Sequence, residues 1–426
     1  MHTTLSKIIP ILLLAAITLS ACSPAVSPEA KSDQARILAP DVPTANLDAL
    51  VGGNNAFAFD LYQSLRSTDG NLFYSPYSIS LALAMTYGGA RGETESQMAQ
   101  ALHFDLPQVD LHAAFNRLDL DLAQSSQAPE KDESQRMQLN IANAVWAQQD
   151  YPFLVEYLDL LALNYGAGLN LADFVTQAEP ARKEINDWVS DRTEERIKDI
   201  LGPGALDALT RMVLVNAIYF KADWMDQFDP NDTEDAPFYL LDGSDVTVDM
   251  MSNDVYAPYL RGENFQAVEL QYAGGTAAMD IIMPDAGQFA AFEADLDWAM
   301  VESILAGMQS TDVQLQMPKF TFRSQFSLAD TLAGMGMPSA FDPGSADFSG
   351  MDGSRDLYIS SVIHQAFVAV DEEGTEAAAA TIVVMTLSAM PMSEIQLTLD
   401  HPFIFLIRDL SSGQILFAGR VLDPGQ

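Results

Sequence analysis

The feature that most restricts the fold is a series of apolar runs in the second half of the chain, several of which lack a polar face. Their β-branched and aromatic residues predict strands. A strand that is apolar on both faces needs a covering layer on each side of its sheet. We therefore expect large sheets buried between other layers. The runs are Met212–Phe220, Ala277–Met283, Asp312–Phe322, Gln365–Val370, Ile395–Leu399, Phe403–Ile407 and Gln414–Val421.

Helical signals lie mainly in the first half of the chain. An apolar stretch follows Ser75-Pro76 and stops at paired glycines, which is typical of a helix start and end. Two further helices are predicted at Glu93–Leu102 and Arg182–Leu201, the second with one apolar face at helical spacing. Helices followed by strands, without regular alternation, indicate the α+β class. The apolar face of the second helix consists of Ile185, Trp188, Val189, Ile197 and Ile200.

Charge excludes one class of function. The 426 residues include 59 acidic and 21 basic side chains, which gives a net charge of −38. Binding to nucleic acid or to an anionic membrane through bulk charge requires Lys and Arg to displace counterions. We therefore expect no nucleic-acid partner. With 48% hydrophobic and 19% charged residues, the chain can bury a large core.

The N-terminus predicts export. Residues 1–21 have a basic start and a short apolar stretch, as in a signal peptide. Leu19-Ser20-Ala21-Cys22 resembles the lipobox of bacterial lipoproteins, in which cleavage precedes the cysteine and its thiol carries lipid. An ordinary cleavage site beside an incidental cysteine is the alternative. Ser23 after the cysteine is typical of outer-membrane lipoproteins, so we expect a protein of the bacterial envelope, facing the periplasm or the cell surface, or extracellular.

The rest of the chain is interpreted as one domain behind a linker. Proline recurs among small and polar residues in 22–45, which predicts a disordered linker that carries the lipidated cysteine. No later break in composition divides residues 46–426, and the polar stretch Ser125–Gln135 is interpreted as a loop. Cys22 is the only cysteine, so no intramolecular disulfide can form.

The sequence offers no convincing enzyme site. It has no histidine or cysteine spacing suited to a metal, no Gly-x-Ser-x-Gly motif and no phosphate-binding loop. His364 lies within the apolar run Leu357–Val370. A buried, hydrogen-bonded histidine fits that setting better than a general base open to substrate, which is the alternative. We expect neither catalysis nor a bound metal or cofactor.

Residues 371–390, DEEGTEAAAATIVVMTLSAM, fit neither a plain helix nor a plain loop. At a period of two, the positions from Thr375 to Met385 are uncharged and small to medium in size, while Glu376 falls on the other face. One face could therefore be buried as a strand. Alanine content favours a helix, and composition leaves the two equally supported.

At this segment the sequence resembles the inhibitory members of the serpin family. The resemblance extends over residues 46–425 through several blocks in order: NLFYSPYSISLALAMTYGGARGETESQM at 71–98, RKEINDWVSDRTEERIKDIL at 182–201, VNAIYFKADW at 215–224 and LTLDHPFIFLIRDLSSGQILFAGRVLDP at 397–424. The residues that match the hinge of these inhibitors are Gly374, Thr375, Glu376, Ala377, Ala378, Ala379 and Ala380.

The resemblance implies a fold of three β-sheets with eight or nine helices and an exposed reactive loop at about 374–394. It implies an irreversible suicide inhibitor of serine, or cysteine, proteases. The protease cleaves the loop and is trapped as an acyl-enzyme while the loop enters the central sheet. A non-inhibitory serpin that serves in binding or storage is the alternative. We expect a monomer.

The family's spacing from the hinge glycine and from Pro402 places the cleaved bond at Ser388-Ala389, with Leu387-Ser388 as the rival. Residues 374–394 contain no Arg or Lys. A trypsin-like target is therefore disfavoured, because its specificity pocket needs a cation. The resemblance thus points to elastase-like, chymotrypsin-like or subtilisin-like proteases.

The resemblance also assigns two clusters in the central sheet. The first is expected where loop insertion begins, and an ion pair between Lys319 and Glu372 would resist premature opening there. The second is expected beneath the sheet, where strands must separate. The residues are Trp224, Lys319 and Glu372 for the first cluster, and Ser75, Ser78, Asn216 and His364 for the second.

Overall fold

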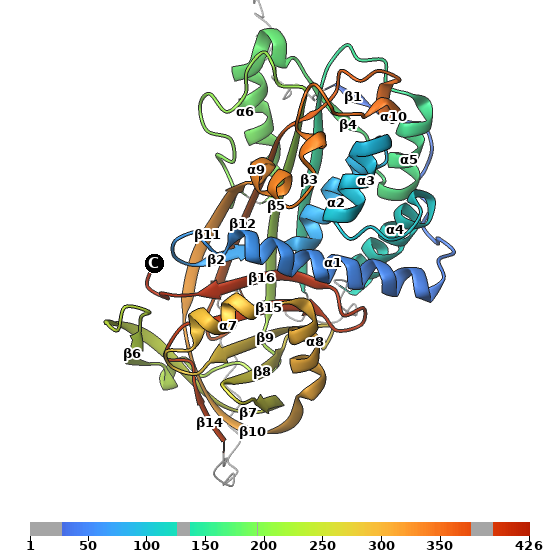
Figure 1. Ribbon diagram of the computed structural model, residues 1–426. Helices are drawn as coiled ribbons and strands as arrows, with labels where there is room; N and C mark the ends of the chain where they lie inside the picture. The colour runs from blue at the N-terminus through green and yellow to red at the C-terminus, as the bar shows by residue number, and fades with distance from the viewer. Residues whose placement is uncertain (1–27, 126–136, 194, 376–394) are drawn as a thin grey trace, which may run out of the picture.

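A seven-stranded sheet, called the central sheet below, runs through the upper half of the molecule (Figure 1). The computed structural model describes residues 28–125, 137–193, 195–375 and 395–426. Strands β5 and β12 lie side by side in parallel, and β11 forms one edge of the sheet. In order, the strands are β1 (Glu29–Ala30), β4 (Leu169–Ala172), β3 (Gln138–Gln148), β5 (Met212–Asp223), β13 (Gly374–Thr375), β12 (Ile359–Val370) and β11 (Phe320–Ser327).

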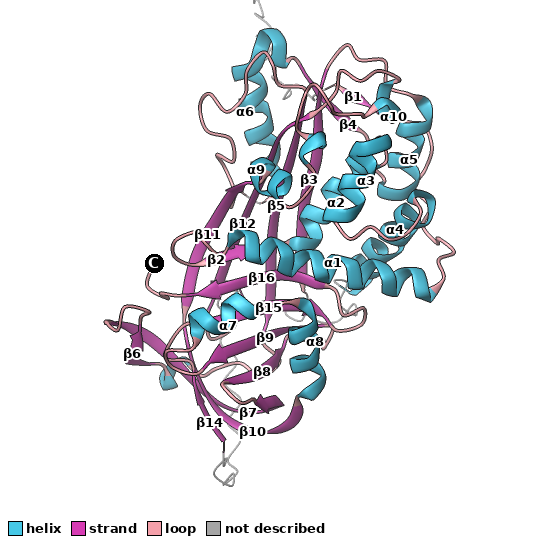
Figure 2. Cartoon of the chain, viewed as in Figure 1, coloured by secondary structure: helices cyan, strands magenta, loops and turns pink. Residues whose placement is uncertain are grey.

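A second sheet of nine strands forms the lower half of the molecule (Figure 2). Its innermost strands are completely buried, as their continuous apolar sequence predicts. The order is β14 (Ile395–Thr398), β10 (Gln309–Pro318), β7 (Asp245–Arg261), β8 (Phe265–Gln271), β9 (Ala277–Pro284), β15 (Phe403–Asp409), β16 (Ile415–Val421) and β2 (Leu72–Tyr74), and β6 (Glu234–Tyr239) pairs with β7.

Helix α2 (Pro76–Tyr87) joins the two sheets. All of its residues are buried, and it contacts β3 and β5 of the central sheet and β16 of the second sheet. A helix that is apolar all round requires such a position between layers. The Ser75 side chain caps its first turn by accepting from the Ser78 N–H, as the sequence predicts.

The other helices cover the sheets from outside. Helix α6 packs on the outer face of the central sheet, where a second apolar core lies between it and β3 and β5. Among the described residues the remaining α-helices are α1 (Thr44–Leu65), α3 (Gly92–Ala101), α4 (Gln108–Ser125), α5 (Val155–Tyr165), α7 (Phe289–Asp295), α8 (Trp298–Gly307), α9 (Ala329–Gly334) and α10 (Ser349–Asp352), with α6 spanning Phe174–Arg192. None of them is long and apolar enough to cross a membrane.

The α+β class is confirmed, with differences in how elements are counted. The described residues form ten α-helices instead of eight or nine. The count includes the short helices α9 and α10. The three expected sheets appear as two hydrogen-bonded sheets. The long strands β7 and β10 pair along their length, and β6 and β14 pair with them, so all four belong to the nine-stranded sheet.

Two predicted elements are divided in the structure. The run 312–322 is two strands in different sheets, because the chain turns at Lys319 between β10 and β11. The helix expected over Arg182–Leu201 ends at Arg192. Three residues further on, Glu195 adopts a φ of +61°. Ile197 and Ile200 still reach the same buried cluster as Ile185. The apolar pattern therefore predicts burial correctly but overextends the helix.

The structure corrects the expectation of a disordered linker for the second part of residues 22–45. From residue 28 onward the chain lies against the domain, and β1 adds an edge strand to β4. Arg36 donates to the Asn116 and Asp119 side chains over 2.8 and 2.7 Å, and the Ile37 N–H donates to the Leu163 carbonyl over 2.9 Å. Helix α1 then begins at Thr44. The segment is held by polar contacts, and it lacks the apolar periodicity from which a sequence pattern could predict its docking.

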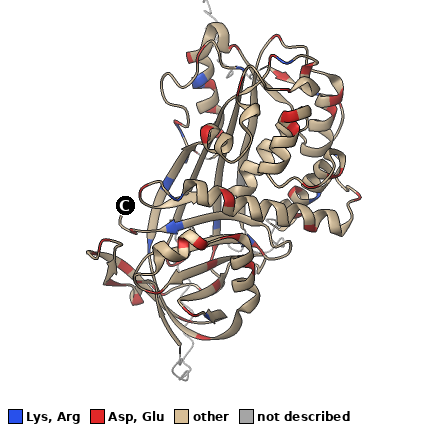
Figure 3. Cartoon of the chain, viewed as in Figure 1, with Lys and Arg blue, Asp and Glu red and all other residues tan. Residues whose placement is uncertain are grey.

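Acidic residues, coloured red in Figure 3, are scattered over the described helices, strands and loops. The net charge of −38 is therefore spread over the molecule and is not the mark of one acidic face. The expected polar loop Ser125–Gln135 lies almost entirely outside the described residues.

Candidate functional site

A row of polar side chains crosses the central sheet where β5 and β12 are paired. Asn143 on β3 lies opposite Asn216 on β5, which lies opposite His364 on β12. Phe326 on β11 extends the row, and its ring stacks on His364 with centroids 6.4 Å apart. We call Asn143, Asn216 and His364, together with Ser75 and Ser78, the polar row.

Hydrogen bonds tie the polar row to helix α2 below the sheet. Asn216 Nδ2 donates to Ser78 Oγ over 2.6 Å, and Ser78 Oγ donates to Asn143 Oδ1 over 2.9 Å. Asn143 Nδ2 in turn donates to the Ser78 carbonyl over 3.0 Å. Because buried polar groups must be paired, these bonds hold β3 and β5 together over the N-terminus of the helix.

His364 is neutral in this setting. Its Nε2 accepts the Ser75 backbone N–H over 3.1 Å, so Nδ1 carries the proton and donates to Asn216 Oδ1. Burial lowers the pKa of His364 to about 3. Protonation would turn Nε2 into a donor that faces another donor. The ring therefore serves as a structural bridge between β12, β5 and α2, which fits the expectation of a buried histidine.

A second cluster lies at the C-terminal end of β5, where the strand leaves the central sheet. Trp224 Nε1 donates to the Asp371 carbonyl over 3.0 Å, and the Trp224 backbone N–H donates to the Glu373 carbonyl over 2.8 Å. The indole stacks on Tyr272 with centroids 4.7 Å apart. Trp224 therefore fixes the turn that follows β12.

Lys319 and Glu372 form the expected ion pair. Lys319 Nζ lies 2.8 Å from Glu372 Oε2, and Thr233 Oγ1 donates to Glu372 Oε1 over 2.8 Å. Burial opposes ionisation of Glu372, but the bonds from Lys319 and Thr233 hold its pKa below the usual value. The Glu372 side chain is only 11% exposed, so the pair is better shielded than a surface pair. It joins the corner between β10 and β11 to the turn after β12.

The first two hinge residues are already part of the central sheet. Gly374 and Thr375 form β13, with Gly374 opposite Asp223 and Thr375 opposite both Ala222 on β5 and Val370 on β12. Thr375 is 1% exposed and shares a hydrogen bond of 2.8 Å with the Tyr272 hydroxyl. A side chain on Gly374 would lie 2.1 Å from the Ala222 carbonyl oxygen, so only glycine fits there.

From β13 toward the N-terminus of β5, the central sheet is closed. Strands β5 and β12 pair directly from Met212 opposite Ile359 to Tyr219 opposite Phe367. Thr375 therefore enters the sheet at the end where these two strands diverge. Their direct pairing leaves no room for another strand until β5 and β12 separate.

The remaining expected site residues lie outside the described residues. They are the hinge positions Glu376, Ala377, Ala378, Ala379 and Ala380, the cleavage positions Leu387, Ser388 and Ala389, and the lipidation position Cys22.

Three residues of these clusters are missed by sequence reasoning. Asn143 completes the polar row, while Tyr272 and Thr233 hold Thr375 and Glu372. Each sits in an ordinary strand or turn sequence without a motif. Only the strand register could have identified Asn143, as the partner of Asn216.

Known proteins share this architecture. A family model described as serpin, serine protease inhibitor, matches residues 52–424. A leukocyte elastase inhibitor of Xenopus laevis is 40% identical over 377 residues, covering 86% of this chain and 97% of the frog protein. A serpin-like protein of Thermococcus kodakarensis is 40% identical over 396 residues, covering 90% of this chain and 89% of its own.

The crystal structure of tengpin, a thermophilic serpin in its native state, superposes with a TM-score of 0.80 at 28% identity and covers 92% of this chain and 97% of tengpin. The chain belongs to the serpin family.

Proposed function

We propose that the protein is an irreversible, single-use inhibitor of serine proteases that traps its target by inserting the cleaved loop into the central sheet. The observation that carries this proposal is the position of Thr375, which pairs with β5 and β12 at the diverging end of the sheet. The chain that follows Thr375 would lengthen β13 along β5, toward Met212, if β5 and β12 parted. The protein would then act as an inhibitor and not as an enzyme.

The sequence after Thr375 suits a buried strand. Its alternate positions are small or apolar, and an inward charge would obstruct entry. A strand over 375–388 would span about 46 Å. At about 0.5–1.5 kcal/mol net per hydrogen bond, its insertion would contribute on the order of 10 kcal/mol, which is comparable with the stability of a whole domain. Such a gain could hold a protease at the far end of the molecule.

The target class follows from the loop sequence. No Arg or Lys lies between residues 374 and 394, and Ser388-Ala389 and Leu387-Ser388 are small or apolar at the proposed cleaved bond. The relatives named as leukocyte elastase inhibitors support an elastase-like target. Chymotrypsin-like and subtilisin-like proteases remain candidate targets, because the same loop sequence also points to them.

The proposal is tested by mixing the protein with elastase, chymotrypsin and subtilisin, with trypsin as the disfavoured control. We expect an adduct that survives boiling in detergent with at least one of the first three, and mass spectrometry of the released peptide to place the cut at 387–389. Cleavage without an adduct for every protease would contradict inhibition and favour the non-inhibitory binding or storage function.

We also propose that Cys22 anchors the exported protein to a bacterial envelope membrane through lipid. The support is the lipobox-like Leu19-Ser20-Ala21-Cys22 and the placement of the only cysteine there. Expression of the full chain in a bacterium with a lipoprotein pathway should give a product in the membrane fraction, and Cys22→Ser should release it. Equal distribution of both forms would contradict the anchor.

A further inference from the structure

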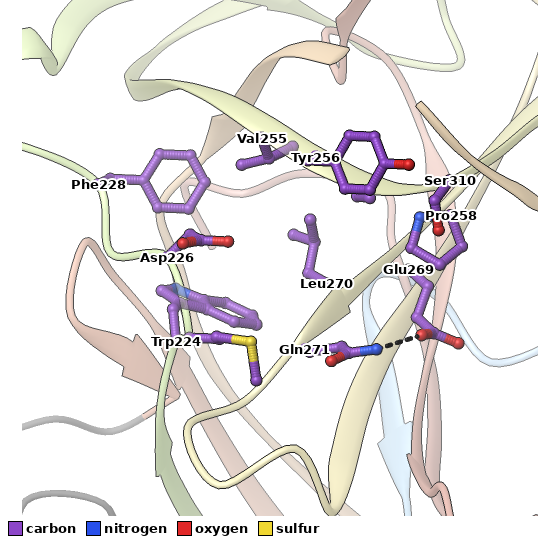
Figure 4. A pocket seen from close by; sticks show the side chains of 12 residues that line it. Trp224, Asp226, Phe228, Val255, Tyr256, Pro258, Glu269, Leu270, Gln271 and Ser310 are labelled. Carbon is purple, nitrogen blue, oxygen red and sulfur yellow. Dashed lines mark hydrogen bonds between the residues drawn. The ribbon is translucent and has the colours of Figure 1, made fainter. Parts of the chain in front are cut away.

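A pocket of about 250 Å³ opens where strands β7 and β8 separate (Figure 4). The two strands pair only from Tyr259 opposite Val268 to Arg261 opposite Gln266 and then diverge. The chain segment 224–228 closes the gap as a third wall. It is held in place by the Met225 N–H, which donates to the Gln271 carbonyl over 2.9 Å.

The walls of the pocket combine aromatic faces with negative charge. Trp224 and Phe228 are buried, and Tyr256 is 69% exposed at the mouth. Asp226 lies between Phe228 and Trp224 on one side, and Glu269 lies across the pocket (Figure 4). None of the lining residues is Lys, Arg or His.

The two carboxylates differ in what they already bind. Glu269 accepts hydrogen bonds from Arg408, over 2.8 Å, and from Gln271, over 3.1 Å. No described side chain pairs with the Asp226 carboxylate, which is exposed next to the indole of Trp224. Asp226 therefore supplies the uncompensated charge of the pocket.

We propose that this pocket binds a small organic cation with an apolar body, an arylalkylammonium in its simplest form. An ammonium group over the faces of Trp224 and Tyr256 gains cation–π attraction and pairs with the Asp226 carboxylate. The apolar body is shielded by Phe228 and Leu270. The volume of about 250 Å³ lies just below the usual range for small-molecule sites, so the ligand is limited to about the size of one aromatic amine.

The pocket shares a wall with the hinge. The Trp224 and Phe228 backbone N–H groups donate to the carbonyls of Glu373 and Glu372, over 2.8 and 3.0 Å. These bonds join the segment after β5 to the turn after β12, so parting of β5 and β12 during loop insertion would strain or break them. A cation bound against this segment therefore favours the closed sheet and slows insertion. This second step rests on the proposed function, whereas binding itself does not.

Binding is tested by titrating the mature protein with phenethylammonium in a calorimeter, without any protease. We expect one molecule bound per chain, at least tenfold weaker binding of the neutral phenethyl alcohol, and no binding of 3-phenylpropionate. Equal affinity for the cation and the anion would overturn the proposal.

Variants separate this pocket from the remaining acidic surface. Asp226→Asn and Tyr256→Ala should each weaken phenethylammonium binding at least tenfold, and both positions are exposed, so the fold should persist. Asp235→Asn and Tyr239→Ala change the same residue types at exposed positions on β6, outside the pocket, and should leave binding unchanged. Loss of binding in the β6 variants, or none in the pocket variants, would refute the site.

Coupling to the hinge is tested by the rate at which the protein traps elastase, with and without saturating phenethylammonium. We expect slower trapping, and no effect of the cation in Asp226→Asn. At a concentration one hundred times Kd the slowing is at most about a hundredfold. Unchanged trapping by a protein that demonstrably binds the cation would refute the coupling, whereas a protein that binds the cation and traps no protease would refute the proposed function alone.

Discussion

At the scale of single residues, two polar side chains of the central sheet, Thr375 and His364, are buried and hydrogen-bonded. Thr375 holds the hinge in the sheet through Tyr272, and His364 bridges two strands and a helix. A buried polar group is costly to leave without a partner. Substitutions at these positions should therefore change the behaviour of the sheet more than their size suggests.

Replacement of the first inserted side chain tests the role of the hinge. Thr375→Arg would place an unpaired cation where the threonine is 1% exposed, at a cost of several kcal/mol. We expect loop entry to slow relative to release of the cleaved protein. The moles of protein consumed per mole of elastase blocked should rise at least severalfold. Thr247→Arg, at an exposed position on β7, is the matched control and should inhibit normally.

The buried histidines predict a loss of stability in acid. Burial lowers the pKa of His364 to about 3 and that of His112 to about 4, below 6.5 in the unfolded chain. The unfolded state therefore binds more protons than the folded state below pH 6.5. The free energy of unfolding decreases as the pH is lowered through this range. Burial raises the pKa of Asp280 to about 6, which acts in the opposite direction between pH 6 and 4.

Among the groups with the largest pKa shifts in this pH range, two histidines act against one aspartate, so we expect thermal unfolding at a lower temperature at pH 5 than at pH 7. The assignment is checked by NMR of the histidine rings, in which His364 should show no titration between pH 8 and 5. A ring that titrates near 6.5 would contradict the role assigned to it.

At the scale of elements, the segment before α1 belongs to the folded domain. It adds β1 to the free edge of β4, and Arg36 ties it to helix α4. Asn116 is fully buried, and its amide is satisfied from both sides, by Arg36 and by the Ile37 carbonyl. The segment thus completes hydrogen bonds that the domain could not make alone.

Removal of the Arg36 side chain should destabilise the protein. Arg36→Ala takes a charged donor from a buried amide and a partner from Asp119, a loss of about 1–2 kcal/mol. We expect the midpoint of thermal unfolding to fall by about 2 °C at a fixed scan rate. Arg117→Ala removes an exposed pair with Asp121 on the same helix and should have a smaller effect. Equal effects of the two changes would argue against docking of the segment.

At the scale of the whole molecule, the proposed mechanism requires the central sheet to accept one more strand. Strand β13 occupies only the end of the position between β5 and β12. If the loop stays outside while insertion is favourable, the native state is held by a kinetic barrier and not by equilibrium. Strands β5 and β12 would then have to part first beside β13, at Tyr219 opposite Phe367, before the polar row opens.

Cleavage of the loop tests this property without a trapped protease. A protease that cuts within 376–394 should free the upstream strand to enter the sheet. At about 10 kcal/mol, the gain should raise the midpoint of thermal unfolding by at least about 10 °C. Circular dichroism before and after cleavage measures the shift. An unchanged midpoint would mean that the cut loop stays outside the sheet.

The sequence by itself determined the apolar strands, the capped helix α2, and, through a resemblance over most of the chain, the family. These are local signals, or patterns carried along the chain, and they need no knowledge of which segments meet. The burial of Ile197 and Ile200 could likewise be predicted, even though their helix ends early.

Only the tertiary structure decided which partners these residues have. Ser75 and His364 are 289 positions apart, and Tyr272 and Thr375 are 103 apart. The division of 312–322 at Lys319, the docking of residues 28–43 and the recruitment of Asn143 depend on strand register and on the hydrogen-bonding needs of buried groups. These needs are met through space, by whichever donor or acceptor the fold places nearby, and no periodicity along the chain records that choice.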